Sequence, residues 1–144
     1  MDLQELRMPK ATGIKFVLAA KEIVKNTVTI TRETDFSLSF RYKGYYGKVE
    51  FSDMLPLVSV SASKKLQTEI SDEDKKLIPE VDALEPYNKN FNPALLELNR
   101  VKNTCSAGTV IFLESGFDGD ILLIAINQCV TKLQAFLDRR EQTI

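Results

Sequence analysis

Apolar residues near the N-terminus recur with the spacing of an α-helix. Over residues 12–25 they form one wide stripe, interrupted by Lys15, Lys21 and Glu22 on the opposite side. The pattern predicts a helix over these residues, with a stop near Asn26.

After residue 26 the period of the apolar residues falls from 3.6 to 2. Apolar and polar residues alternate in four segments, which are TVTIT (27–31), FSLSFRYK (36–43), KVEF (48–51) and VSVSAS (58–63). Alternation of β-branched and aromatic residues with polar ones is typical of strands with one buried face and one wet face. Because the connections are short, we expect an antiparallel meander.

Two helix starts follow the meander. Ser71 can cap a helix that begins with SDEDKKL, and Asp74 occupies the reciprocal position of a capping box. Pro79 should end or kink that helix. A second start is predicted at Asn92-Pro93, because asparagine caps helices and proline suits the first helical position. The buried stripe of the second helix would contain Leu95, Leu98 and Val101.

The C-terminal third predicts a second hairpin and a closing helix. Its strands would be GTVIFLE (108–114) and DILLIAIN (120–127), joined by SGFDG at the turn. A last helix is expected over residues 128–140. The whole chain, 1–144, is then a single α+β domain. We expect one antiparallel sheet of five to six strands, with helices on one face and the order α-β-β-β(-β)-α-β-β-α.

Composition restricts the function more than it restricts the fold. The 144 residues are 44% hydrophobic and 27% charged, with a net charge of −1 and a pI of about 5.6. Such a chain has no general field that attracts nucleic acid or anionic lipid. The longest apolar run, residues 121–126, is far shorter than a membrane span. We expect an untargeted cytoplasmic protein with Cys105 and Cys129 as buried, reduced thiols.

The chain contains no histidine, which excludes Ser-His and Cys-His catalytic pairs and imidazole ligands for zinc. Asp118 and Asp120 in GFDGD lack the further ligand positions of a calcium loop, so they are interpreted as turn residues. The serines of VSVSAS have no base beside them. We therefore expect no enzyme activity, no cofactor and no metal site.

Two stretches are candidates for contact with a partner. In YKGYYG, the residues Tyr42, Tyr45 and Tyr46 lie beside basic side chains and could stack on a partner or on nucleic acid bases. The alternative is a hairpin turn in which glycines supply positive φ, and it agrees better with the strand pattern on both sides.

The other stretch is the expected second hairpin, whose strands are apolar on both faces and so need cover on both. The cover would be the chain's own helices or the 64–92 segment, or else a second subunit across a two-fold axis. The residues involved would be Ile111, Leu113, Leu122 and Ile124.

The order of elements resembles the YbjN-like and type III secretion chaperone-like group. The stretches that carry the resemblance are FSLSFRYKGYYGKVEF and LLELNRVKNTCSAGTVIFLE…GDILLIAIN. Gly44 stands where that group has a turn glycine, and Leu98-Asn99 stands where it has a Leu/Ile-Asn pair. The resemblance implies a small, acidic, cytosolic, non-catalytic domain that binds other proteins and is often dimeric.

The leading hypothesis is a non-catalytic protein-binding domain, a chaperone-like adaptor or regulator that forms a homodimer. The alternative is a small-molecule-binding domain with a pocket between sheet and helix, lined by Tyr42, Phe51 and Tyr87. Single-stranded nucleic acid binding through the tyrosines is a third hypothesis.

Overall fold

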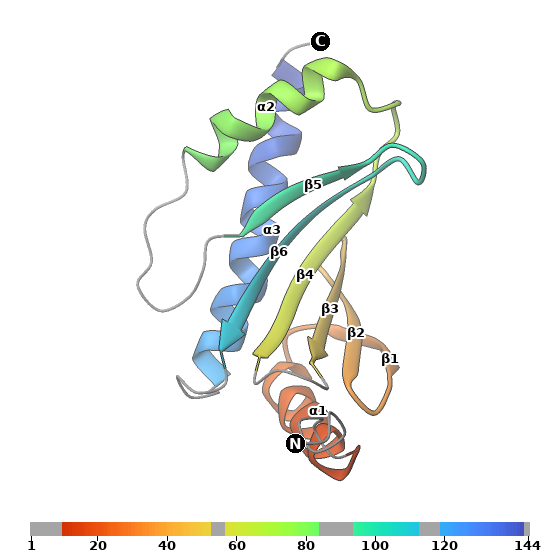
Figure 1. The fold of residues 1–144 in the computed structure, drawn as a ribbon, viewed down its shortest axis with the longest axis vertical. Coiled ribbons are helices and arrows are strands. Elements are labelled where there is room, and N and C mark those ends of the chain that lie inside the picture. Colours follow the sequence, from red (N-terminus) through yellow and green to blue (C-terminus); the bar gives the residue numbers. More distant parts are fainter. Residues whose placement is uncertain (1–9, 53–56, 84–93, 113–118, 143–144) are drawn as a thin grey trace, which may run out of the picture.

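The computed structural model describes residues 10–52, 57–83, 94–112 and 119–142. These residues form three helices and one antiparallel sheet of six strands (Figure 1). The elements are α1 (Lys10–Val24), β1 (Thr29–Glu33), β2 (Ser37–Tyr42), β3 (Tyr45–Phe51), β4 (Leu57–Lys65), α2 (Asp72–Asp82), β5 (Leu95–Asn99), β6 (Thr104–Phe112) and α3 (Gly119–Gln142). The strand order is β1-β2-β3-β4-β6-β5. The predicted α+β class, the single antiparallel sheet and the element order are confirmed.

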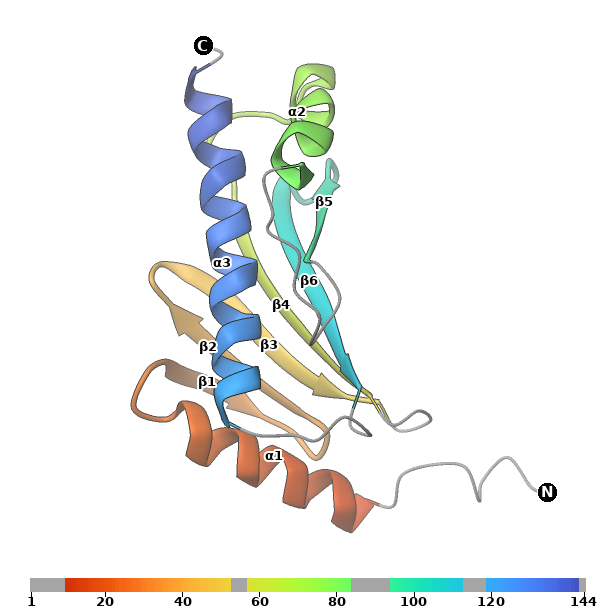
Figure 2. The same cartoon turned by 90° about the vertical axis from the view of Figure 1, so that its left-hand side faces the viewer.

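The helices lie on one face of the sheet. Helix α3 packs against β4 and β6, α1 contacts β2, β3 and α3, and α2 contacts α3 and β5 (Figure 2). The large inward-facing side chains of the strands are fully buried and include Leu38, Phe40, Val49, Phe51, Val60 and Ile111. The opposite face, called here the open face, is not covered by any helix of the described residues.

The alternation predicted for the early strands is present in the structure. In β4, the apolar Val58, Val60 and Ala62 are buried beneath α3, while the serines between them face the other way. The clean period of two arises because one face of the sheet meets helices and the other meets solvent.

The YKGYYG stretch forms the predicted hairpin. Its turn contains only the first of the two glycines, Gly44. Tyr42 pairs with Tyr45, which leaves Lys43 and Gly44 as a two-residue turn. Both have positive φ, 52° and 84°, as a type I′ turn requires. Gly47 instead lies within β3, directly against the ring of the buried Phe40, where a Cβ atom would come within 2.2 Å of the ring.

Helix α2 has the capping box that the sequence predicts. The Ser71 side chain accepts from the Asp74 backbone N–H, and the Asp74 side chain accepts from the Ser71 backbone N–H. Pro79 was expected to end or kink this helix. It does not end the helix, since α2 continues to Asp82. Pro79 and Lys75, whose carbonyl loses its helical donor, are both exposed, so water can reach that carbonyl.

Two predictions about the C-terminal third are wrong. Residues 95–99, expected in a helix, form strand β5, in which Leu96 and Leu98 face the core and Leu95 is exposed. Residues 120–127, expected to be a strand, form the first turns of α3. The expected second hairpin therefore does not exist, and β6 pairs with β5 and β4 instead. The expected helix start at Asn92-Pro93 lies outside the described residues.

Helix α3 is long and apolar enough, by length and composition alone, to cross a membrane. Its apolar side lies on the sheet, where Leu122, Leu133 and Phe136 are fully buried. This is the placement of a core helix in a globular domain.

Candidate functional site

The tyrosines of the hairpin point to two different faces of the sheet. Tyr45 is buried on the helix side, and its hydroxyl donates to Gln134 Oε1 of α3 at 2.6 Å. Tyr42 is half-buried on the same side, with its hydroxyl 3.5 Å from Asn127 Oδ1 of α3. Both hydroxyls thus face the protein's own helix, and contact of these two tyrosines with a partner stays a prediction.

Tyr46 is the exception, since it lies on the open face with 52% of its surface exposed. Arg41, its cross-strand neighbour, donates from Nη2 to the Tyr46 hydroxyl at 3.0 Å. The guanidinium carbon lies 4.8 Å from the centre of the Tyr46 ring, a cation–π contact. This pair combines an aromatic ring with a cation and is exposed to a partner.

The residues expected on the two apolar faces of the second hairpin are separated in the structure. Ile111 of β6 and Leu122 of α3 are both buried in the core, and Ile124 is half exposed on α3. Leu113 lies outside the described residues. The side chains of Ile111 and Leu122 are thus hidden in the core between the sheet and α3, without a second subunit.

The pocket expected between sheet and helix has a different lining from the predicted one. Phe51 is buried and stacked on Phe16 of α1 at 5.3 Å between ring centres, and Tyr87 lies outside the described residues. A shallow cleft of about 370 Å³ does lie between the β2–β3 turn and α3. Its polar groups bond to one another, since Tyr45 donates to Gln134 and Gln134 donates to Asp138 at 2.8 Å. A ligand would have to compete with these bonds.

The open face has a floor of small side chains along its two central strands. Ser59, Ser61 and Ser63 of β4 point outward, and the register places Gly108 and Ser106 of β6 opposite the last two. A groove of about 460 Å³ follows this floor and is lined mainly by Ser59, Ser61, Leu95, Gly108 and Val110.

Large apolar side chains lie exposed at one side of this groove. Leu95 of β5 is 67% exposed and Phe112 of β6 is 51% exposed. Val110 is the outward residue of β6 between Phe112 and Gly108, the residue opposite Leu95, and it is half-buried. The alternation in β6, TCSAGTVIF, carries this signal, because Val110 and Phe112 fall on the outward positions where the earlier strands have serines. Sequence reasoning missed it by treating the apolar run as a covered strand.

Basic residues predominate among the charges of the open face. By strand alternation and register, its charged members among the described strands are Arg32, Arg41, Lys48, Lys65, Glu50 and Glu97. Lys48 forms an ion pair with Glu50 at 3.1 Å. Arg41 and Lys65 lie toward the opposite end of the groove from Phe112, so the face grades from an apolar end to a basic end.

The cysteines are packing residues in this structure. Both thiols are buried, and they point to the backbone carbonyls of Lys64 and Val60. Burial raises the pKa of Cys105, which keeps this thiol protonated and unreactive near neutral pH. Among the described residues no three Cys, Asp or Glu side chains come together in a way that could hold a metal ion. Asp120 lies in the first turn of α3, and Asp118 is outside the described residues.

Compared with models of known protein families and with curated proteins, the chain matches none. The resemblance to the YbjN-like and type III secretion chaperone-like group therefore stays a prediction.

Proposed function

We propose that this chain is a non-catalytic protein-binding domain, a chaperone-like adaptor or regulator, and that it binds its partner on the open face of the sheet. The observation that supports this function is the pair Leu95 and Phe112, which lie exposed beside a groove on a face that no described helix covers. By register Val110 lies between Leu95 and Phe112, and an apolar strip of this kind on a largely polar face is typical of protein interaction sites.

The arrangement of the face suits binding better than catalysis. The serines on its floor have no histidine anywhere in the chain to activate them. Arg41 and Tyr46 are of the residue types that provide most of the free energy at protein interfaces, and Phe112 is of a type that is enriched there. The floor of small residues allows a partner to approach closely.

A homodimer stays a prediction. The prediction was based on the apolar faces of the expected second hairpin, and that hairpin is absent because residues 120–127 are helical. The open face is five strand spacings wide, and its strands average about seven residues, which gives a flat area of roughly 550 Å². Two such faces amount to roughly 1,100 Å², whereas permanent dimers bury about 2,000 Å² or more. An area of this size fits transient binding of another protein, as an adaptor requires.

A capture experiment with face-specific variants tests this function. The wild-type chain, Phe112→Lys and Ile124→Lys are immobilised and exposed to lysate of the source cells, and the bound proteins are identified by mass spectrometry. Phe112 and Ile124 are matched, because both are about half exposed and only the former lies on the open face. We expect proteins that are retained by the wild type and by Ile124→Lys and lost with Phe112→Lys. Equal capture by all three chains would contradict the proposal.

A further inference from the structure

The groove on the open face is bordered by two ridges. Its floor consists of the outward serines of β4 and of Gly108 and Ser106 of β6. On one side stand Tyr46 and Lys48 of β3, and on the other stand Leu95 and Glu97 of β5. The ridges are three strand spacings apart, about 14 Å. An α-helix with its side chains is about 10–12 Å wide, so one helix fits between them.

An extended segment is a poor occupant of this position. The face of a sheet presents side chains, so a strand lying on it would leave its own backbone N–H and C=O groups without partners. A helix bonds its backbone internally and can bury a stripe of side chains. The sheet has two edges where an added strand could pair, β1 and β5. Strand β1 carries a bulge between Ile30 and Arg32 and has charged residues at positions 32 and 33, and β5 is only five residues long and contacts α2.

The charge of the face determines which helix it favours. Four of its six charged residues are basic, and Glu50 is paired with Lys48. The basic end, with Arg41 and Lys65, would meet carboxylates. Leu95 beside the middle of the groove and Phe112 at its other end would meet apolar side chains.

A second copy of the chain does not offer such a helix among its described residues. The exposed apolar residues of α1, Ile14 and Leu18, lie on a helix with three lysines and a single glutamate, so this helix does not supply the row of carboxylates that the basic end would meet. The apolar residues of α2 and α3 are largely used inside their own fold. Two open faces would also repel each other, since each has an excess of basic residues.

We infer that the occupant of the groove is an amphipathic α-helix of a different protein, with apolar residues on one stripe and carboxylates beside it, lying along β4 and β6. This inference rests on the proposed function and names the kind of partner that the open face binds. The floor from Ser59 to Ser63 spans about 13 Å, which corresponds to about nine helical residues.

Two synthetic peptides test the inference directly. Both are about 16 residues long, share leucine and alanine at helical spacing and carry one tryptophan, but one has glutamates and the other lysines on its polar side. Because the protein has no tryptophan, the emission of the peptide reports binding without interference. Circular dichroism of the mixture, corrected for the protein, shows whether the bound peptide is helical.

Two protein variants locate the binding. Gly108→Leu fills the groove, and it should fold normally because the atoms nearest a Cβ atom at this position are 3.6 and 3.7 Å away. Arg41→Glu combined with Lys65→Glu reverses the charge of the basic end. The thermal midpoint of each variant is measured first to show that the fold is intact.

We expect the glutamate peptide to bind the wild type as a helix, and to bind each variant about tenfold more weakly. The lysine peptide should bind the wild type more weakly than the glutamate peptide does, and the difference should shrink as salt is added. Equal affinity for both peptides, unchanged affinity in Gly108→Leu, or binding without helix formation would overturn the inference. A wild-type dimer that Gly108→Leu converts to monomer, seen by light scattering, would assign the groove to a second copy and also overturn it.

The result is separable from the test of the proposed function. If Phe112→Lys abolishes capture of a protein but neither peptide binds, the open face is a protein-binding site and the helical occupant is wrong. If capture does not depend on Phe112, the proposed function itself fails.

Discussion

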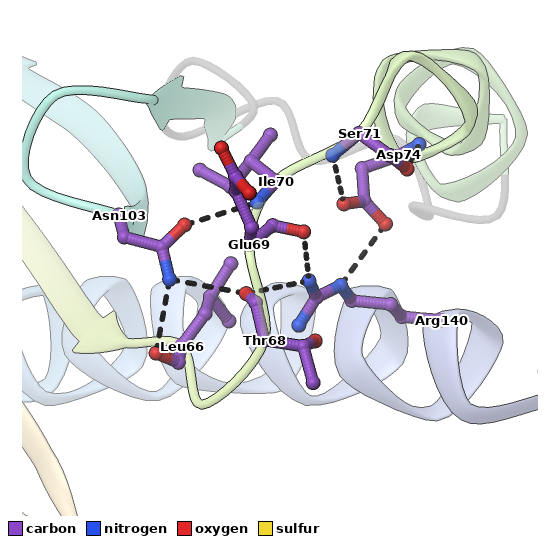
Figure 3. A network of polar contacts seen from close by, with 8 residues as sticks. All are labelled: Leu66, Thr68, Glu69, Ile70, Ser71, Asp74, Asn103 and Arg140. Atoms are coloured by element: carbon purple, nitrogen blue, oxygen red, sulfur yellow. Dashed lines mark hydrogen bonds and ion pairs between the residues drawn. The ribbon is translucent and has the colours of Figure 1, made fainter.

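Arg140 of α3 donates from Nε to Oδ1 of Asp74 in the first turn of α2, across 3.0 Å (Figure 3). The other oxygen of Asp74 accepts from the backbone N–H of Ser71 at 2.8 Å. Arg140 also donates from Nη2 to the carbonyl oxygens of Thr68 and Glu69. One guanidinium therefore joins the end of α3 to the β4–α2 connection and to the cap of α2.

Because the Arg140–Asp74 pair is buried, we expect a large loss of unfolding free energy when one partner is removed. The side chains are 13% and 6% exposed, so Arg140→Met would leave the buried Asp74 carboxylate without its cation and would remove one donor from each of the Thr68 and Glu69 carbonyls. The Thr68 carbonyl keeps the hydrogen bond from Asn103. Breaking a buried pair in this way costs about 3–5 kcal/mol of unfolding free energy. Urea unfolding followed by circular dichroism measures it.

Arg139→Met is the matched control. The neighbouring Arg139 pairs with Glu80 at 3.1 Å, but both of these side chains are largely exposed. An exposed pair contributes at most about 1 kcal/mol. If the two variants lost the same stability, the Arg140 pair would have no special structural role.

Asn103 predicts a second stabilising contact at the same connection (Figure 3). It has a φ of 55°, and its Nδ2 group donates to the carbonyls of Leu66 and Thr68, while its Oδ1 accepts from the N–H of Ile70. Asn103→Ala loses three hydrogen bonds and places an alanine in the left-handed region, so we expect a loss of about 2–4 kcal/mol.

Asn103→Gly separates the two causes. Glycine adopts the positive φ without strain, so this variant should lose the hydrogen bonds alone and be more stable than Asn103→Ala by about 1 kcal/mol. Equal thermal midpoints for the two variants would show that backbone conformation contributes nothing here.

Local sequence signals explain why the first half of the fold could be predicted. Strands β1 to β4 alternate because one face meets helices and the other meets water, and the Ser71–Asp74 capping box involves residues three apart. The contacts that hold α2 in place are not local. Arg140 and Asp74 are 66 positions apart, and no pattern in the sequence pairs them.

The C-terminal third shows where periodicity becomes ambiguous. A short apolar run such as residues 121–126 fits a covered strand or a buried helix equally well. The available signal was the longer pattern, because Leu122, Ala125, Cys129, Leu133 and Phe136 keep helical spacing with no glycine or proline between them. Their stripe continues without a break into the helix predicted from residue 128.

The helix predicted around residue 95 failed for a related reason. Asn92-Pro93 is a strong local start signal, and three leucines follow it closely. The two of them that face the core, Leu96 and Leu98, are spaced by two, as pairing with β6 requires. Tertiary pairing overrode the local preference. The same pairing places Leu95 on the open face, where no local pattern predicts a groove.

The two glycines of the central strands predict opposite responses to the same substitution. A Cβ atom at Gly47 would lie 2.2 Å from the ring of Phe40, which is fully buried and cannot move aside, whereas a Cβ atom at Gly108 meets nothing closer than 3.6 Å. We expect Gly47→Ala to lose about 1–3 kcal/mol by overpacking. Gly108→Ala should be neutral or slightly stabilising, because alanine restricts the unfolded chain. Thermal unfolding of the pair decides this, and a larger loss in Gly108→Ala would contradict it.

Tyr45 predicts how stability changes at alkaline pH. Burial raises the pKa of Tyr45, and the nearby Cys105 and Asp138 raise it further by charge. Burial also raises the pKa of Cys105. Because both groups keep their protons longer in the folded state, the unfolded state ionises first as the pH rises. Their contribution is complete below the ordinary values of about 8.5 for cysteine and 10 for tyrosine, and it is lost as the pH rises through the folded-state values.

The free energy of unfolding should therefore be nearly constant between pH 7 and 8 and fall at higher pH. The variant Tyr45→Phe separates the contribution of Tyr45 from that of Cys105. At pH 7 this variant should lose about 1 kcal/mol, because the hydrogen bond to Gln134 is removed. Above pH 9 its stability should fall less steeply than that of the wild type, since no buried phenol remains to ionise. Gln134→Ala is the control, because it removes the same hydrogen bond and keeps the phenol, so its alkaline decline should persist. An alkaline slope in Tyr45→Phe as steep as the wild type's would show that Tyr45 does not contribute to the decline.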